Sequence, residues 1–236
     1  MTETSNQIRE HHHADVSGGW LRPAVFGAMD GLVTNIALIA RVGGGGVPAG
    51  TIVLTGVAGL VAGAISMGLG EYTSVQSQNE QIAAEVAKER RELERNPAGE
   101  AAELADAWTA RGLPRDLAEQ VAEAIRANPR EALRVHVQEE LGVDPDEQPS
   151  PWTAAFSSFL CFTAGALVPL ASYLLGFTSL WLALAIGGAG LFVAGAVVAR
   201  FTYRRWWWSG GRQLLLGAAA AAATYLIGRL IGVVAG

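Results

Sequence analysis

Residues 51–93 read TIVLTGVAGLVAGAISMGLGEYTSVQSQNEQIAAEVAKERREL, an apolar segment that runs directly into a polar one. Its first part, from about Thr51 to Leu69, is almost entirely apolar and approaches the roughly 20 residues that a membrane-spanning helix needs. Its second part is polar and rich in glutamate, but it contains no helix-breaking proline. We therefore expect one helix that crosses a membrane and continues into water, ending near Arg95, just before the Asn96–Pro97 pair.

Four other segments are also long and apolar enough to cross a membrane. They run from about Pro23 to Val42, Trp152 to Leu175, Ser179 to Phe201 and Gln213 to Val234. The sequence therefore predicts an all-α membrane protein with five transmembrane helices and a three-helix insert between the second and third. The expected domains are a tail over residues 1–20, the first two spans over 21–77, the insert over 78–149, and the last three spans over 150–236.

Helix-stop signals divide the insert. We expect three helices there, namely the extension of the second span to about Arg95, a helix that starts near Pro97, and a helix that starts near Arg115. Gly112 suits the end of the middle helix, because glycine readily adopts the left-handed conformation that often closes helices. A further helical piece is expected to end at Gly142.

Charge is distributed unevenly along the chain. Residues 78–149 contain 17 acidic and 9 basic residues, whereas the remainder contains 5 acidic and 8 basic residues. An acidic insert argues against a nucleic-acid partner, because phosphate binding requires a basic surface. It favours a cationic ligand.

The basic loop between the last two spans predicts the orientation. It carries Arg200, Arg204, Arg205 and Arg212, and basic residues in short loops favour the cytoplasmic side. Alternation of five spans then places the N-terminus and the insert in the cytoplasm and the C-terminus outside. No targeting signal is visible, so we expect the inner (plasma) membrane of a bacterium.

Three side chains near the apolar segments are candidates for a transport pathway. Asp30 lies about two turns inside the first span, where an ionisable group is costly and usually faces a cavity or pathway, unless it simply meets water at the interface. Met67 and Glu71, four residues apart on the second span, put a thioether and a carboxylate on one helix face. That pair suits a borderline divalent metal, although a methionine in a membrane helix more often only packs.

The insert offers two glutamate pairs with helical spacing. Glu89 and Glu92 share one helix face, and Glu100 and Glu103 repeat the spacing on the next helix. Two such faces packed together would place four carboxylates near one point, where their mutual repulsion attracts a cation. Spacing alone leaves open a solvated charged helix, since Lys88 and nearby arginines could pair with these acids.

The last helical piece adds further candidate ligands. Glu139 and Glu140 contribute carboxylates, and His136 precedes Glu140 by four residues, so its imidazole shares that face. Oxygen ligands with one imidazole suit Mn²⁺, Fe²⁺, Co²⁺ or Zn²⁺.

Three motifs, in order, resemble the vacuolar iron transporter family: RPAVFGAMDGLVTNIALIARV, GAISMGLGEYTSVQSQ and the glutamate-rich insert ending in EELG. The resemblance covers nearly the whole chain from about Leu21. It implies a homodimeric exporter that moves Fe²⁺, often with Mn²⁺ as a second substrate, out of the cytosol by proton antiport. Glutamates matching the family's soluble site are Glu89, Glu92, Glu100, Glu103 and Glu140.

The resemblance also implies that Asp30 and Met67 line the membrane pathway, with Glu71 at its cytoplasmic mouth. This chain departs from the family pattern in one place, because His136 or Val137 stands where a methionine often precedes the EELG glutamates. The departure removes a thioether from the soluble site and adds an imidazole, which titrates near neutral pH.

We therefore expect a transporter and not an enzyme, with no permanently bound cofactor. Its partners would be divalent metal ions, protons, the lipid bilayer and a second copy of the chain. A membrane-anchored metal sensor or buffer without transport is the alternative. A ferroxidase fits poorly, because di-iron sites use a Glu-x-x-His pattern, whereas His136 in the insert precedes a glutamate, Glu139, by three residues.

Overall fold

The computed structural model describes residues 19–235, and within them the chain is all-helical, as predicted. The predicted cytoplasmic tail, residues 1–20, lies outside this range except for its last two residues. The helices are α1 (Leu21–Gly44), α2 (Ala49–Arg95), α3 (Pro97–Ala110), α4 (Arg115–Arg126), α5 (Pro129–Leu141), α6 (Pro151–Leu174), α7 (Leu180–Thr202) and α8 (Trp206–Ala235).

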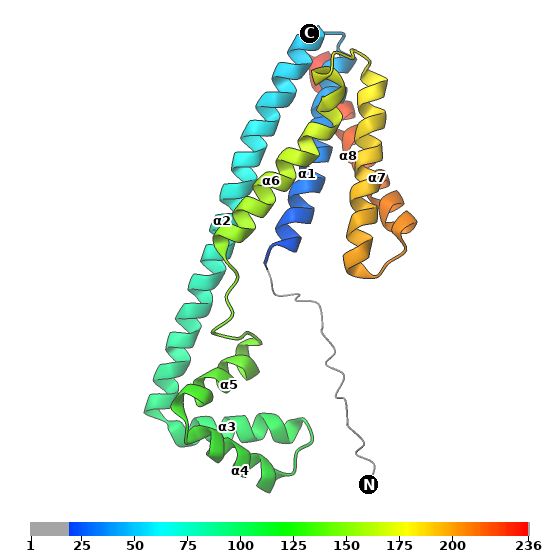
Figure 1. Ribbon diagram of the computed structural model, residues 1–236. Helices are drawn as coiled ribbons and strands as arrows, with labels where there is room; N and C mark the ends of the chain where they lie inside the picture. The colour runs from blue at the N-terminus through cyan, green and yellow to red at the C-terminus, as the bar shows by residue number, and fades with distance from the viewer. Residues whose placement is uncertain (1–18, 236) are drawn as a thin grey trace, which may run out of the picture.

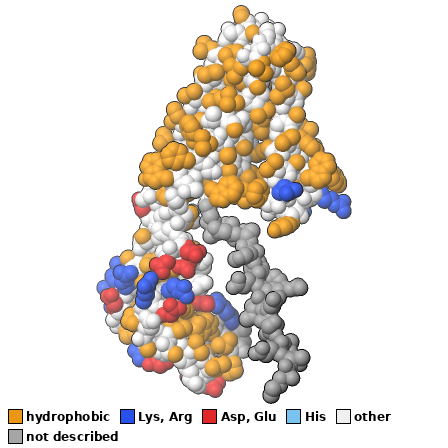
Figure 2. Space-filling model, in the orientation of Figure 1, with side chains coloured by type: hydrophobic (Ala, Val, Ile, Leu, Met, Phe, Trp, Pro, Cys, Tyr) orange, Lys and Arg blue, Asp and Glu red, His pale blue; other side chains and the backbone are white. Residues whose placement is uncertain are grey.

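The helices form an apolar bundle and a separate charged insert, joined by the long helix α2 (Figure 1). Hydrophobic side chains cover the visible face of the bundle, whereas acidic and basic side chains gather on the insert (Figure 2). By length and composition, α1, α2, α6 and α7 can each cross a membrane. The fifth expected span coincides with α8, a helix of 30 residues, and stays a prediction.

The connection between α7 and α8 is shorter than expected. The sequence predicts a loop up to about Gln213, but α8 already begins at Trp206. The ring of Trp206 meets Phe192 of α7 edge-on, with ring centroids 6.0 Å apart. This aromatic contact holds the first turn of α8 against α7, so the tryptophans belong to the helix.

Close backbone contact between α1 and α6 organises the bundle. A Cβ atom added at Gly27 would lie 2.5 Å from the carbonyl oxygen of Ser158, and one at Gly31 would overlap the carbonyl oxygen of Phe162. Next to this contact, the buried Asn35 amide donates a 2.7 Å hydrogen bond to the carbonyl oxygen of Ala166. Small residues therefore let two apolar helices approach closely enough for a polar side chain to bond across them.

The insert has a thin core of its own. Leu104, Ala105, Ala118 and Ala122 form its buried cluster, with Trp108 packed beside them. The helix boundaries agree with the sequence signals, because Gly112 and Gly142 both take positive φ angles, 102° and 67°, at helix ends. Mostly small side chains fill this core, so the position of α5 also depends on its packing against α2.

The α1–α6 contact generates a stability prediction. Gly31→Val should destabilise the bundle by about 1–3 kcal/mol or more, because the side chain has no room against α6. Thermal unfolding of the detergent-solubilised protein, followed by circular dichroism, measures the effect.

Gly70→Ala is the matched control, because nothing lies within 4 Å of a Cβ added there. Alanine also favours a helix over glycine by about 1 kcal/mol, so this variant should melt no lower than wild type. Equal melting temperatures for Gly31→Val and wild type would contradict the packing described.

Candidate metal centre

Four side chains from three helices of the insert meet at one point. They are Glu89 on α2, Glu100 on α3, and His136 and Glu140 on α5. Each offers a ligand atom, and these atoms all lie within 4.8 Å of one another. We call this group the carboxylate–histidine cluster.

Local signals in the sequence build the cluster. Helix α2 ends at Arg95. The side chain of the next residue, Asn96, accepts a 3.1 Å hydrogen bond from the backbone N–H of Gly99 and so caps the start of α3. This turn brings Glu100, in the first turn of α3, back toward the last turns of α2. Helix α5 starts in the same way at Asn128, and it places His136 and Glu140 one turn apart on one face.

Two of the four side chains are deeply buried. Glu89 is 5% exposed and His136 is 3% exposed. The His136 Nδ1 atom lies 3.3 Å from Oε1 of Glu89 and 3.9 Å from Oε2 of Glu100. Among the described residues, no donor makes a hydrogen bond to this Oε1 atom. A buried carboxylate oxygen without a donor is costly, and a bound cation would remove that cost.

The pKa values reflect this crowding. Burial, helped by repulsion from Glu140 and Glu100, raises the pKa of Glu89 to about 7. Burial also raises the pKa of Glu100, with Glu103 as the next cause. For His136, burial lowers the pKa although Glu140 and Glu103 oppose this. The fold therefore disfavours both the ionised glutamates and the protonated imidazole, and neutral imidazole is the form that binds metals.

A small cavity adjoins the cluster. Its volume is about 20 Å³, and its lining includes Glu89, Glu92 and Glu140. A space of roughly 10–15 Å³ holds one water-sized particle, so this cavity has room for a single ion. Glu92 therefore lies beside the cluster, although it is not one of the four converging residues.

The donor set indicates which ions fit. Three carboxylates and one imidazole offer oxygen and nitrogen atoms and no thiolate. Imidazole suits first-row metals such as Fe²⁺ and Zn²⁺, and carboxylates also suit Mn²⁺. The arrangement can bind a divalent transition-metal ion. Such an ion would reduce the repulsion between the carboxylates and so stabilise the packing of α2, α3 and α5.

Glu139, predicted as a ligand, points elsewhere. Its Oε1 atom accepts a 3.3 Å hydrogen bond from the indole N–H of Trp108, and Arg111 forms an ion pair with Oε2. Neighbouring residues on a helix point about 100° apart, so Glu140 faces the cluster while Glu139 ties α5 to α3. The signal in the sequence was the lone tryptophan within a polar insert, which needs a hydrogen-bond partner when partly buried.

The predicted pathway residues occupy separate places in the bundle. Asp30 is half-buried at a cavity of about 220 Å³ between α1 and α8, and Thr34 Oγ1 lies 3.5 Å from its Oδ1 atom as a weak donor. Met67 packs against the core around Phe162. Glu71 is buried on α2, 9% exposed, one turn beyond Met67.

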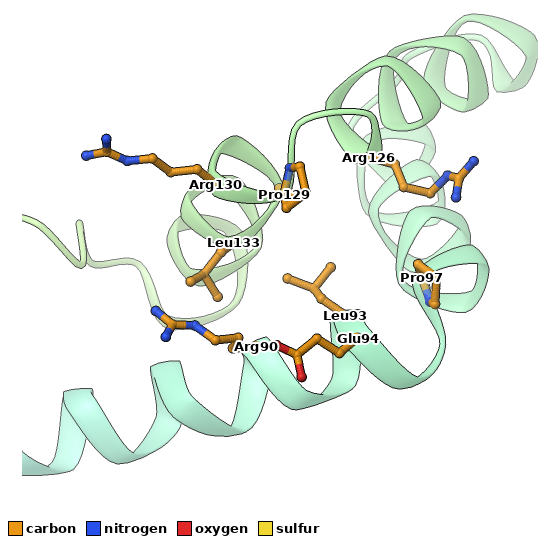
Figure 3. Close-up of a pocket in the computed structure, with 9 residues that line it drawn as sticks. Arg90, Leu93, Glu94, Pro97, Arg126, Pro129, Arg130 and Leu133 are labelled. Carbon is orange, nitrogen blue, oxygen red and sulfur yellow. The ribbon is translucent and has the colours of Figure 1, made fainter.

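A larger cavity of about 480 Å³ lies on another side of the insert, between α2, α4 and α5. Figure 3 shows Leu93 and Leu133 pointing into it, while Arg126 and Arg130 extend away from each other. Three arginines and one glutamate contribute to its lining. This basic, largely apolar cavity disfavours a cation, so within the insert the carboxylate–histidine cluster is the better candidate for a metal site.

A model described as the VIT family matches residues 21–229. The chain belongs to the VIT family. A vacuolar iron transporter of Acanthamoeba castellanii is 38% identical over 191 residues, covering 76% of this chain and 69% of that protein. Vacuolar iron transporter 1 of Tulipa gesneriana is 30% identical over 203 residues, covering 84% of this chain and 82% of that protein.

Vacuolar iron transporter 2 of Oryza sativa subsp. japonica is 32% identical over 192 residues, covering 80% of this chain and 78% of that protein. The resemblance read from the three sequence motifs is therefore confirmed. Membership of the VIT family and the long apolar helices together identify an integral membrane protein.

The cluster predicts which glutamate matters for metal binding. Glu89→Gln should weaken Mn²⁺ binding to the detergent-solubilised full chain at least tenfold, because it removes a charged ligand from a buried site. Calorimetry measures this change. Glu94→Gln is the control, since Glu94 lies on the same helix but lines the arginine-rich cavity. Equal affinities in wild type and Glu89→Gln would exclude Glu89 as a ligand.

The raised pKa of Glu89 predicts how stability depends on pH without metal. Folding disfavours its ionised form, so the destabilisation is absent below about pH 4.5, grows as the pH rises, and is complete above about 7. Glu89→Gln should therefore raise the melting temperature relative to wild type at pH 8 but not at pH 4.

His136 makes stability depend on pH in the opposite direction. Because burial lowers its pKa, the folded state loses stability as the pH falls below 6.5. This contribution is present in both proteins and largely cancels in their difference. Melting curves in the presence of a chelator test the prediction, which fails if the difference between the two proteins is the same at both pH values.

Proposed function

We propose that the chain is a proton-coupled exporter of Fe²⁺, with Mn²⁺, Co²⁺ and Zn²⁺ as further candidate substrates. The carboxylate–histidine cluster supports this proposal, because it contains a buried Glu89 oxygen that accepts no hydrogen bond. Glu89 also lies on the helix whose first part is an apolar span. The names of the relatives, vacuolar iron transporters, support iron as the cargo.

The proposed topology has five spans, with α8 as the fifth. The basic residues around the α7–α8 connection, including Arg204 and Arg205, would face the cytoplasm. Alternation of the five spans would then place the insert on the same side of the membrane. In the proposal, two copies form a homodimer, and each insert collects metal before it reaches the membrane.

Capture would begin at the insert. A divalent ion binding to Glu89, Glu100, His136 and Glu140 replaces the repulsion between carboxylates with attraction to a shared charge. Since the pKa of Glu89 lies near 7, protons compete with metal there within the physiological range. Glu92 and Glu103 would increase the negative potential that attracts the ion.

Transfer would then pass through the bundle. Glu71 and Met67 are proposed to receive the ion at the cytoplasmic end, and Asp30 to bind metal and proton alternately. An aspartate that cannot hold both at once couples the two fluxes, because release of one permits binding of the other. The pH gradient across the membrane would then drive export of metal.

A metal sensor or buffer would use the same cluster without any flux. Measurement of metal movement separates the two functions. Wild-type protein in proteoliposomes should take up Mn²⁺ or Fe²⁺ when a pH gradient is imposed, whereas a sensor or buffer would bind the ion and carry none.

Asp30→Asn tests the coupling role. The amide keeps the shape of the side chain but cannot exchange a proton, so gradient-driven uptake should fall at least tenfold while calorimetric binding at the insert is unchanged. Asp116→Asn, on the exposed start of α4, is the control. Full uptake by Asp30→Asn would exclude Asp30 as the coupling group.

A further inference from the structure

Two cavities join along the same face of α1. The cavity at Asp30 shares Phe26, Met29 and Gln213 with a second cavity of about 510 Å³. The second cavity reaches Arg22, at the start of α1, and Thr202, at the end of α7. Together they form one groove, the α1–α8 groove, which leads from the end of the bundle to Asp30.

Helices α1 and α8 begin at the same end of the bundle (Figure 1). The second cavity lies at this end, since Leu21 and Arg22 contribute to its lining. Asp30 is nine residues along α1 and Gln213 is seven residues along α8, so both lie about 10–14 Å along their helices. A bilayer core is about 30 Å thick, which places both side chains within the same half of the membrane.

The polar atoms in the groove have few protein partners. Among the described residues, the Gln213 amide makes no hydrogen bond, and the Asp30 carboxylate has only the long 3.5 Å contact with Thr34. An amide or carboxylate left unpaired in an apolar medium costs several kcal/mol, as a rough figure. Water in the groove would satisfy both groups, and hydrocarbon would not.

Helix α7 helps to hold Gln213 in place. Gly195 of α7 lies directly against the Gln213 side chain, because a Cβ added at Gly195 would come 2.8 Å from its Cγ atom. The glycine therefore leaves space for the stem of Gln213 beside α7. This contact favours an amide that stays at the groove and does not turn out toward lipid.

We propose that Met29 and Gln213 complete an intramembrane ion site with Asp30, at the inner end of a water-filled α1–α8 groove. The site offers a carboxylate, a thioether and an amide oxygen, a mixed set that suits a borderline divalent metal ion. Arg22 at the mouth is exposed, so water screens its charge. This inference rests on the proposed transport function, which it extends to α8.

Cysteine reactivity tests whether the groove holds water. Gln213→Cys is made in a Cys161→Ala background, since Cys161 is the chain's single cysteine. A positively charged methanethiosulfonate should modify it at least tenfold faster than Leu215→Cys, whose native side chain is 70% exposed on the outer face of α8. Reaction only with a membrane-soluble maleimide would show a lipid-filled groove and overturn the inference.

Transport by matched variants tests the ion site itself. Gln213→Leu should reduce Mn²⁺ and Fe²⁺ uptake at least tenfold, and Gln213→Glu, which keeps an oxygen donor, should restore most of it. Met29→Leu should reduce Fe²⁺ uptake more than Mn²⁺ uptake, because loss of a thioether affects the softer ion more. Leu215→Ala, on the exposed face of α8 and outside the lining of both cavities, is the control.

The outcomes separate the two proposals. If wild-type protein carries no metal, the proposed transport function fails and the ion site fails with it. If wild type transports and Asp30→Asn does not, but Gln213→Leu stays within twofold of wild type, only the inference about α8 is wrong.

Discussion

One unbroken helix, α2, fixes the distance between the carboxylate–histidine cluster of the insert and the apolar bundle. It runs for 47 residues from the apolar bundle into the charged insert, a length of about 70 Å at 1.5 Å per residue. Met67 in the bundle and Glu89 in the cluster lie on this one helix, separated by about 33 Å along its axis. A single ion cannot contact both, so in the proposed mechanism capture at the insert and passage through the bundle would be separate steps.

Electrostatic repulsion between the buried carboxylates of the insert is the basis of the proposed metal capture. Among the described residues, no lysine or arginine forms an ion pair with the three glutamates of the cluster. Arg111 pairs with Glu139 instead, and Arg115 and Arg126 pair with exposed acids. The cluster therefore favours either a proton or a cation, and at neutral pH a divalent ion neutralises more charge. In the bundle, by contrast, close backbone contact between α1 and α6 holds the helices together, and few ionisable side chains are buried there.

Local signals allowed much of the structure to be predicted. Asparagine–proline pairs start α3 and α5, and glycines with positive φ angles close helices, so the helix boundaries of the insert were readable. The sequence could not show that Glu139 and Glu140, equal by composition, point to different partners. It also could not pair Met29 with Gln213, because helical spacing relates residues within one helix and not across α1 and α8.

In the proposed function a divalent ion binds between Glu89, Glu100, His136 and Glu140. Anomalous diffraction from crystals of the full chain grown with Mn²⁺ locates such an ion. We expect an anomalous peak within bonding distance of carboxylate oxygens from both α2 and α5. A fully occupied Mn²⁺ peak elsewhere in the insert, with none between these four side chains, would contradict it.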